Sequence, residues 1–144
     1  WKVLGAFATG GDSVSTSFVP DGIDEAVLST GTPPEGHEWK AVEADKKGWV
    51  SLTNALGNVP YAVAYGYTEV ESVHAREAVL SYIGDDGIKI WLNGTEIQND
   101  DVDKRHEGSV AAYIKEGVNR ILVKLTLVGH GGWGYTLSLP KANF

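Results

Sequence analysis

Apolar and polar residues alternate over long stretches of this chain, a pattern that is typical of half-buried β-strands. In residues 119–127 every second position is Ile, Val or Leu, which predicts a strand with one inward face. Residues 133–139 repeat the pattern with Trp133 and Tyr135 on the apolar face. In residues 61–70 the alternation collects tyrosines on one face and small residues on the other.

Two turn signals divide the segment 78–97 into three predicted strands. Asn93-Gly94 lies between apolar runs, and both residues accept a positive φ, so the pair predicts a tight hairpin. Gly84-Asp85-Asp86-Gly87 predicts a second turn of the same kind. The segment therefore indicates antiparallel β-structure, with two consecutive hairpins.

Shorter apolar runs at 1–7, 39–43, 49–52 and 110–114 add further strands. Gly and Pro interrupt residues 9–38, which predicts a long loop with at most two helical turns near 24–28. A loop of this length in a small domain is usually functional or wraps the core. With about eight or nine strands and no long helix, the sequence predicts an all-β fold. We expect a two-sheet antiparallel β-sandwich of jelly-roll type, forming a single domain over residues 1–144.

Composition narrows the possible partners. The 144 residues suit one domain, and the net charge of -7 argues against nucleic acid or an anionic membrane as a ligand. The longest apolar runs are too short for a membrane helix. The chain has no Cys, which excludes disulfides and thiolate metal sites, and no Met, which indicates a processed protein or an excised domain. We expect a monomer.

Several apparent motifs lack the context that their chemistry needs. Residues 129–134 match G-x-G-x-x-G, but the alternation after them predicts a strand where a dinucleotide site requires a helix. The four His residues are scattered, which argues against zinc. No catalytic constellation stands out, so we expect no enzyme activity. A calcium site using Asp100, Asp101 and Asp103, or using Asp85 and Asp86, stays open beside the alternative of a solvated acidic loop.

The aromatic residues carry more of the functional signal, because sugars stack their C–H faces on Trp and Tyr rings. Trp91 shares a strand face with Lys89 and Asn93, which suggests partial exposure. The alternative is that such large rings belong to the core. The candidate carbohydrate-binding residues are Trp91, Tyr65 and Tyr67 for stacking, with Arg105, His106 and Asn99 for hydrogen bonds.

Three segments carry a resemblance to a known group of domains: the opening W-x-V-L-G-x-F, the block 83–94 (IGDDGIKIWLNG), and G-V-N-R-I-L-V-K-L followed by G-W-G-Y. The chain resembles the jelly-roll, galactose-binding-like accessory domains of bacterial secreted polysaccharide-degrading enzymes. It is also similar to sugar-binding domains beside glycoside hydrolases and, more loosely, to protective-antigen-type lectin domains. The resemblance implies glycan binding, often with calcium. No residue-level site transfers, because the chain departs from the protective-antigen-type pattern and binding loops vary.

The sequence and the resemblance together predict a non-catalytic carbohydrate-binding module, extracellular or at the cell surface. It would tether a catalytic domain of the same parent protein to a polysaccharide or oligosaccharide. The alternative is a structural accessory domain without its own ligand, packed against a neighbouring catalytic domain. A β-sandwich lyase is a third class, and it would need a cluster of Tyr, His and Arg or Lys that the alternation does not bring together.

Overall fold

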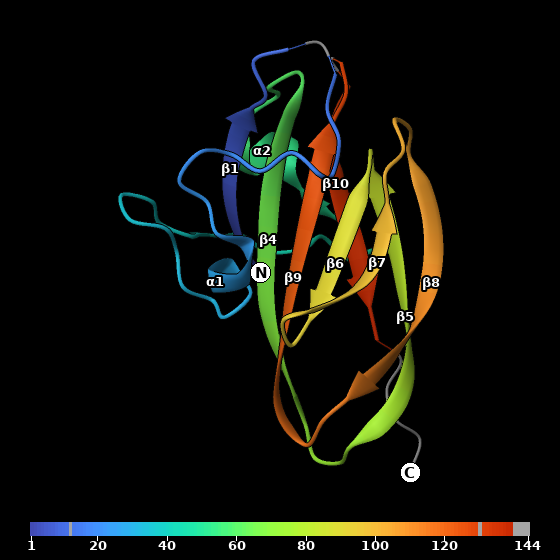
Figure 1. The fold of residues 1–144 in the computed structure, drawn as a ribbon. Coiled ribbons are helices and arrows are strands. Elements are labelled where there is room, and N and C mark those ends of the chain that lie inside the picture. The colour runs from blue at the N-terminus through green and yellow to red at the C-terminus, as the bar shows by residue number, and fades with distance from the viewer. Residues whose placement is uncertain (12, 130, 140–144) are drawn as a thin grey trace.

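Two antiparallel sheets face each other across a hydrophobic core in the computed structural model (Figure 1). The structure describes residues 1–11, 13–129 and 131–139, so the predicted end of the domain at 140–144 lies outside it. The predicted all-β sandwich is confirmed. The strands are β1 (Lys2–Ala8), β2 (Lys40–Ala41), β3 (Val50–Ser51), β4 (Ala62–Ser72), β5 (Arg76–Asp85), β6 (Ile88–Leu92), β7 (Thr95–Asp100), β8 (His106–Ile114), β9 (Gly117–Leu127) and β10 (Gly134–Ser138). The helices are α1 (Glu25–Leu28) and α2 (Leu52–Leu56).

The six-stranded sheet has the order β2-β1-β4-β9-β6-β7, and the four-stranded sheet has the order β3-β10-β5-β8. Every strand pair is antiparallel. The glycine-rich segment 129–134 leads into β10, so a strand follows it as predicted; residue 130 itself lies outside the described part of the chain.

One predicted hairpin is confirmed and the other is wrong. β6 and β7 pair across Asn93-Gly94, whose φ angles of 51° and 83° are those the turn requires. β5 and β6 belong to different sheets, so the turn at residues 84–87 carries the chain from one layer to the other. Helix α2 was not expected; Ser51 begins it by accepting a hydrogen bond from the backbone N–H of Asn54 at 3.1 Å.

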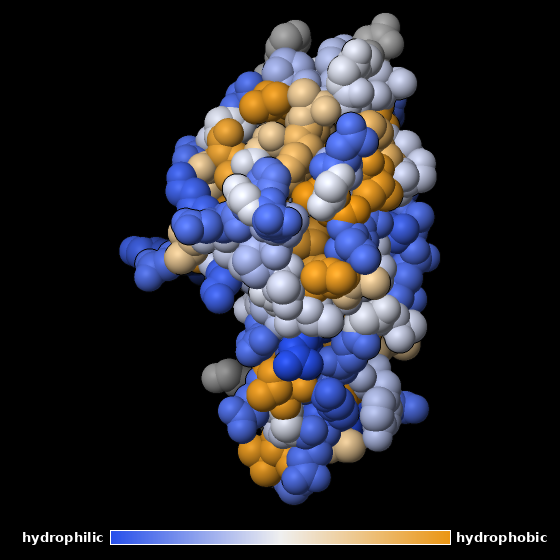
Figure 2. Space-filling model, turned by 60° about the vertical axis from the view of Figure 1, so that its left-hand side comes forward, coloured by the Kyte–Doolittle hydropathy of each residue, from blue (hydrophilic) through white to orange (hydrophobic). Residues whose placement is uncertain are grey.

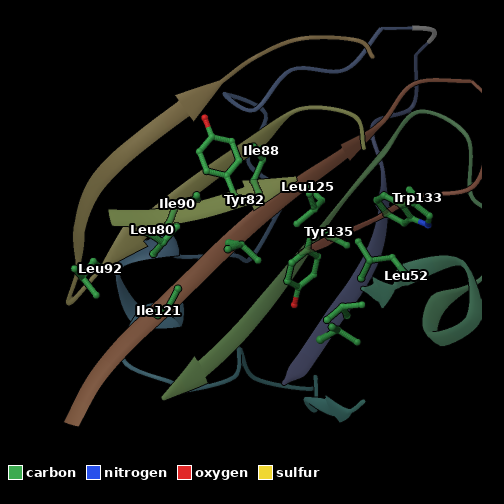
Figure 3. Packing of buried hydrophobic residues seen from close by; sticks show 14 of the residues in the cluster. Leu52, Leu80, Tyr82, Ile88, Ile90, Leu92, Ile121, Leu125, Trp133 and Tyr135 are labelled. Atoms are coloured by element: carbon green, nitrogen blue, oxygen red, sulfur yellow. The ribbon is translucent and has the colours of Figure 1, made fainter. Parts of the chain in front are cut away.

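The main core lies between the sheets and holds the alternating residues that the sequence placed there (Figure 3). The alternating residues Ile121, Val123, Leu125 and Leu127 of β9 are almost completely buried, as are Trp133 and Tyr135. The Tyr135 hydroxyl is the one buried side-chain polar atom without a hydrogen-bond partner among the described residues. Burial raises the pKa of Tyr135 well above its usual value. Gly66 makes room for this hydroxyl, because a Cβ there would lie 2.2 Å from it.

A second hydrophobic cluster covers the outer face of the six-stranded sheet. Ile23 and Leu28 of the long segment 9–39 pack on Tyr65, Tyr67 and Trp91 of the sheet. Figure 1 shows this segment crossing in front of β4 and β9, with α1 beside them. Each fully buried side chain of this size contributes roughly 1.5–3 kcal/mol of burial free energy, so the segment is part of the fold and not a loose flap. We call residues 9–39 the covering segment.

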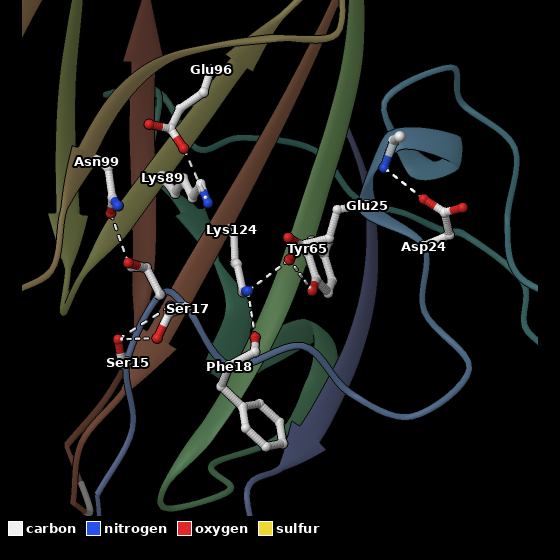
Figure 4. A network of polar contacts seen from close by, with 12 residues as sticks. Ser15, Ser17, Phe18, Asp24, Glu25, Tyr65, Lys89, Glu96, Asn99 and Lys124 are labelled. Carbon is white, nitrogen blue, oxygen red and sulfur yellow. Dashed lines mark hydrogen bonds and ion pairs between the residues drawn. The ribbon is translucent and has the colours of Figure 1, made fainter.

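Lys124 of β9 projects into this second cluster and is completely buried. Its ammonium lies 2.6 Å from the Glu25 carboxylate and donates to the backbone carbonyl of Phe18 (Figure 4). The Tyr65 hydroxyl donates to the same Glu25 oxygen at 2.6 Å. Burial lowers the pKa of Lys124, and Glu25 opposes this effect. All three contacts join the covering segment to the sheet.

Replacing Glu25 by Gln should therefore destabilise the domain by about 3 kcal/mol, because it leaves the Lys124 charge buried without a carboxylate. The combined change Glu25→Gln with Lys124→Met should recover most of that loss, since no charge remains to be solvated. Urea unfolding of the single and double variants measures both free energies.

The control is the Lys89–Glu96 pair, whose atoms are 3.1 Å apart but whose glutamate is 48% exposed. Glu96→Gln should cost less than about 1 kcal/mol, as expected for a pair near the surface. If Glu25→Gln costs no more than Glu96→Gln, the buried pair does not hold the covering segment in place.

Candidate functional site

The covering segment buries the three aromatic rings that the sequence suggested as stacking platforms. Tyr65 is fully buried, Tyr67 is 4% exposed and Trp91 is 9% exposed. Burial, followed by Glu25, raises the pKa of Tyr65, while burial and Glu69 raise the pKa of Tyr67 to about 12. The exposure that stacking requires is therefore absent. Alternation alone could not predict this, because it identifies a strand face and says nothing about what covers that face.

The Tyr67 ring lies against Trp39 of the covering segment, with ring centroids 5.7 Å apart. The Lys89 ammonium lies 5.0 Å from the centroid of the Trp91 ring. Figure 2 shows the molecule turned so that the left-hand side of Figure 1 faces the viewer. Apolar side chains are visible among polar ones on this surface.

The three predicted hydrogen-bonding residues do not converge. Asn99 accepts a hydrogen bond from the Thr16 hydroxyl at 2.7 Å and so faces the covering segment. His106 lies 3.1 Å from Asp100 and is partly buried. Arg105, directly before β8, is exposed at the edge of the four-stranded sheet. The structure brings Arg105 and His106 to one edge and leaves Asn99 elsewhere.

The predicted metal residues also point to different partners. Asp100 accepts hydrogen bonds from Tyr82 and Gln98 and contacts His106; burial alone would raise its pKa, but these contacts lower it. Asp101 accepts from the Ser15 hydroxyl at 2.5 Å and the Thr16 backbone at 3.1 Å.

Asp103 is exposed in the loop between β7 and β8. Among the residues that the structure describes, no three His, Asp or Glu side chains form a group able to hold a metal. The arrangement expected for Asp100, Asp101 and Asp103 is therefore not present.

Asp85 and Asp86, between the two sheets, are the acidic pair that the fold does bring together. Burial, followed by the hydrogen bond and the charge of Asp86, raises the pKa of Asp85 to about 6, and Arg105 opposes the shift. Asp86 is buried and accepts a hydrogen bond from the backbone N–H of Val128 at 2.7 Å. The pair therefore lies at the same end of the molecule as Arg105.

The surface aromatic side chain at this end is Trp49, at the start of β3. Asp45 positions it: one carboxylate oxygen accepts the backbone N–H groups of Lys47 at 2.8 Å and Trp49 at 2.9 Å. The indole ring lies over Gly134, where a Cβ would come within 2.6 Å of it. The Arg105 guanidinium stacks on the ring at 5.1 Å from its centroid.

Trp49 also forms a wall of a surface hollow of about 530 Å³. Polar side chains supply most of the remaining lining, namely Lys40, Glu43, Asp45, Ser51 and Asn54. A partly exposed indole beside an amide, carboxylates and an ammonium is the combination that holds a polyhydroxylated ring. This hollow, with Trp49 and Arg105, is the candidate site; we call it the Trp49 hollow.

Sequence reasoning identified Arg105 and missed Trp49. The residue follows the Asp45–Gly48 turn and lies directly before β3, a two-residue edge strand that pairs with β10 on one side only. This position, between a turn and an edge strand, was the sequence signal that could have indicated an exposed Trp49. The pairing of Trp49 with Arg105, 56 positions later, depends on β3 and β8 belonging to the same sheet.

No family model matches the chain, and no curated protein matches it at the level of sequence. Solved structures do share its fold. The PA14 domain of the MpAFP antifreeze protein gives a TM-score of 0.59 at 16% identity, over 96% of this chain and 80% of that one.

A β-glucosidase from Kluyveromyces marxianus, solved in complex with glucose, gives a TM-score of 0.54 at 14% identity over 79% of this chain. The matched part is 16% of the length of that enzyme. A family 35 carbohydrate-binding module from Paenibacillus barcinonensis gives a lower TM-score of 0.41 at 13% identity, over 71% of this chain and 88% of that one. The likenesses to the PA14 domain and to the β-glucosidase establish the β-sandwich fold. Within the described residues, no helix is long and apolar enough to span a membrane.

The raised pKa of Asp85 gives the domain a defined pH dependence. A carboxyl group whose pKa rises from 3.8 in the unfolded chain to about 6 in the fold stabilises the fold fully below pH 3.8. This contribution is lost as the pH rises through 6. The free energy of unfolding of the wild type, relative to Asp85→Asn, should therefore fall between about pH 4 and pH 7.

Urea unfolding at several pH values measures this difference, and Asp103→Asn controls for the loss of one negative charge. A difference between wild type and Asp85→Asn that stays constant across the range would show that Asp85 titrates normally.

Proposed function

We propose that this domain is a non-catalytic carbohydrate-binding module, and that the Trp49 hollow holds the sugar. In its natural setting it would tether a secreted catalytic domain, or a cell-surface assembly, to a polysaccharide. Tethering raises the effective concentration of the enzyme at its substrate without any new catalytic group. The observation that carries the proposal is a partly exposed tryptophan that forms the wall of a polar hollow.

The chemistry of the hollow supports a sugar over other small ligands. Arg105 and Gly134 lie against the indole ring, so the part of the indole that stays exposed is the apolar surface offered to the C–H face of a pyranose. Asn54 and Glu43 are exposed beside it and supply both donors and acceptors. The Lys40 ammonium donates to the carbonyl of Ala55 at 2.7 Å, which fixes one wall and leaves two N–H donors.

The structural likenesses add support of a coarser kind. The matched β-glucosidase was solved with glucose, and the part it shares with this chain is a small fraction of the enzyme. That is the relation expected of an accessory domain beside a catalytic one. An extracellular or cell-surface location is part of the same proposal.

The alternative function is a structural accessory domain that packs on a neighbouring catalytic domain. Val79 and Tyr113, 51% and 62% exposed on the outer side of the four-stranded sheet, favour it. Such an exposed apolar pair lowers the free energy of a protein contact as well as that of a sugar contact.

Trp49→Ala should abolish or weaken glycan retention at least about tenfold, which corresponds to 1.4 kcal/mol. Retention is measured by pull-down on insoluble cellulose, xylan, mannan, chitin and β-1,3-glucan, followed by titration with the matching oligosaccharide. Tryptophan fluorescence of the wild type should change on binding, and this change should be lost with Trp49.

Trp91→Phe is the matched control, because this tryptophan is buried beneath the covering segment. Thermal unfolding checks that each variant folds. Failure of the folded wild type to bind any of the polysaccharides at millimolar concentration would favour the structural alternative.

We further infer that calcium, which the resemblance to sugar-binding accessory domains implies, belongs at Asp85 and Asp86 and not at Asp100–Asp103. The loop carboxylates Asp100 and Asp101 each accept at least two hydrogen bonds from other residues, and Asp86 accepts one from the backbone N–H of Val128. Asp85 and Asp86 disfavour each other's charge, and a divalent cation would relieve that repulsion. Carboxylate oxygens are the ligands that calcium prefers, and the pair supplies part of the about six to eight that it takes.

Calcium chloride added after treatment with a chelator should raise the melting temperature in a saturable way. The rise should be lost in Asp86→Asn and kept in Asp101→Asn, and isothermal titration gives the affinity. No rise in the wild type, or a rise removed only by Asp101→Asn, contradicts this assignment.

A further inference from the structure

Among the described residues, the outward side chains of β5 and β8 in the four-stranded sheet are mostly exposed, unlike those beneath the covering segment on the six-stranded sheet. Side chains leave this face at every second position of β5 and β8, and the register places them in rows. Four of these rows are Ile83 with Glu107, Ser81 with Ser109, Val79 with Ala111, and Glu77 with Tyr113. β10 extends the first two rows with Thr136 and Ser138.

The middle of this face is hollowed because its side chains are short. Ser81, Ser109, Thr136 and Ser138 line one hollow of about 400 Å³. Val79, Ala111 and Tyr113 border the next, of about 430 Å³. The two adjoin along β5 and β8, and a third of about 250 Å³ lies beside Arg105. The hollows therefore follow the strands in one line.

Each end of the line has an aromatic ring. Trp49 stacks on Arg105 at one end, and Tyr113, 62% exposed, stands at the other. Arg105 and Tyr113 are eight residues apart on nearly continuous strand, which corresponds to about 27 Å at 3.4 Å per residue. That length is greater than a disaccharide and suits an extended chain of several sugars.

The charges on this face select against an anionic chain. Glu77 and Glu107 point outward from β5 and β8, while Arg105 lies at the Trp49 end of the face. A polyanion would approach more negative than positive charge. The serine and threonine hydroxyls both donate and accept hydrogen bonds, which matches the hydroxyls of an uncharged sugar.

We propose that this face binds an extended, uncharged polysaccharide chain lengthwise, with Tyr113 as a second stacking platform distant from Trp49. The proposal rests on the proposed function and specifies its ligand: a long neutral glycan and not a terminal monosaccharide. The hydroxyl-lined middle distinguishes this occupant from a protein partner, which would require a continuous apolar core.

Titration with an oligosaccharide series, from disaccharide to hexasaccharide, of the polysaccharide that the wild type retains tests the proposal. Affinity should rise along the series. Tyr113→Ala should weaken hexasaccharide binding about tenfold and leave disaccharide binding unchanged. Tyr113→Phe keeps the ring and should bind like the wild type, while Val73→Ala, in the exposed connection between β4 and β5 and outside the face, controls for surface change.

An affinity that stops rising at the disaccharide, or a Tyr113→Ala variant that binds the hexasaccharide normally, overturns this inference and leaves the Trp49 hollow intact. Absence of binding to every member of the series would instead overturn the proposed function. Sedimentation velocity completes the test, because a dimer that Tyr113→Ala dissociates would identify the face as a contact between copies.

Discussion

The ammonium group of Lys124 is the constraint around which the outer half of this molecule is arranged. A charge at the centre of a sheet face is costly to bury unless it is paired, and the two groups that contact it both come from residues 18–25. The covering segment thus supplies a carboxylate and a carbonyl along with its apolar side chains. Without it, a hydrophobic sheet face bearing Tyr65, Tyr67 and Trp91 would be open to water.

This arrangement makes the two outer faces of the sandwich different in kind. The aromatic side chains on the outer face of the six-stranded sheet pack against the covering segment. The four-stranded sheet carries short hydroxyl-bearing side chains on its outer face. The candidate binding groups consequently lie on strands, on helix α2, on a turn held by Asp45 and in short connections beside these elements. Groups fixed on regular elements keep their spacing, so little conformational entropy is lost when a ligand contacts several of them.

Much of the fold could be predicted from the sequence, because alternation and turn chemistry are local. The inward residues of β9 and the Asn93-Gly94 hairpin are examples. The turn at 84–87 was misread because a short glycine turn looks the same whether the strands beside it pair or pass to opposite sheets. For Tyr65 and Trp91 the sequence left open whether the rings are exposed or buried, because their cover comes from residues 9–39 and no local pattern links those residues to β4 or β6. Trp49 was missed because its importance depends on Gly134 and Arg105, which are neighbours only in the folded sheet.

The hollows along β5 and β8 belong to a sheet, and sheets twist with a fixed right hand. Over the distance from Arg105 to Tyr113, the direction in which side chains leave the surface rotates. A single polysaccharide strand in solution has free glycosidic torsions and follows such a rotation. The flat surface of a crystalline fibre does not, and it would contact one end of the face or the other. For a domain that binds a polysaccharide as proposed, the twist of the sheet would favour the disordered, hydrated regions of that polysaccharide over its crystalline ones.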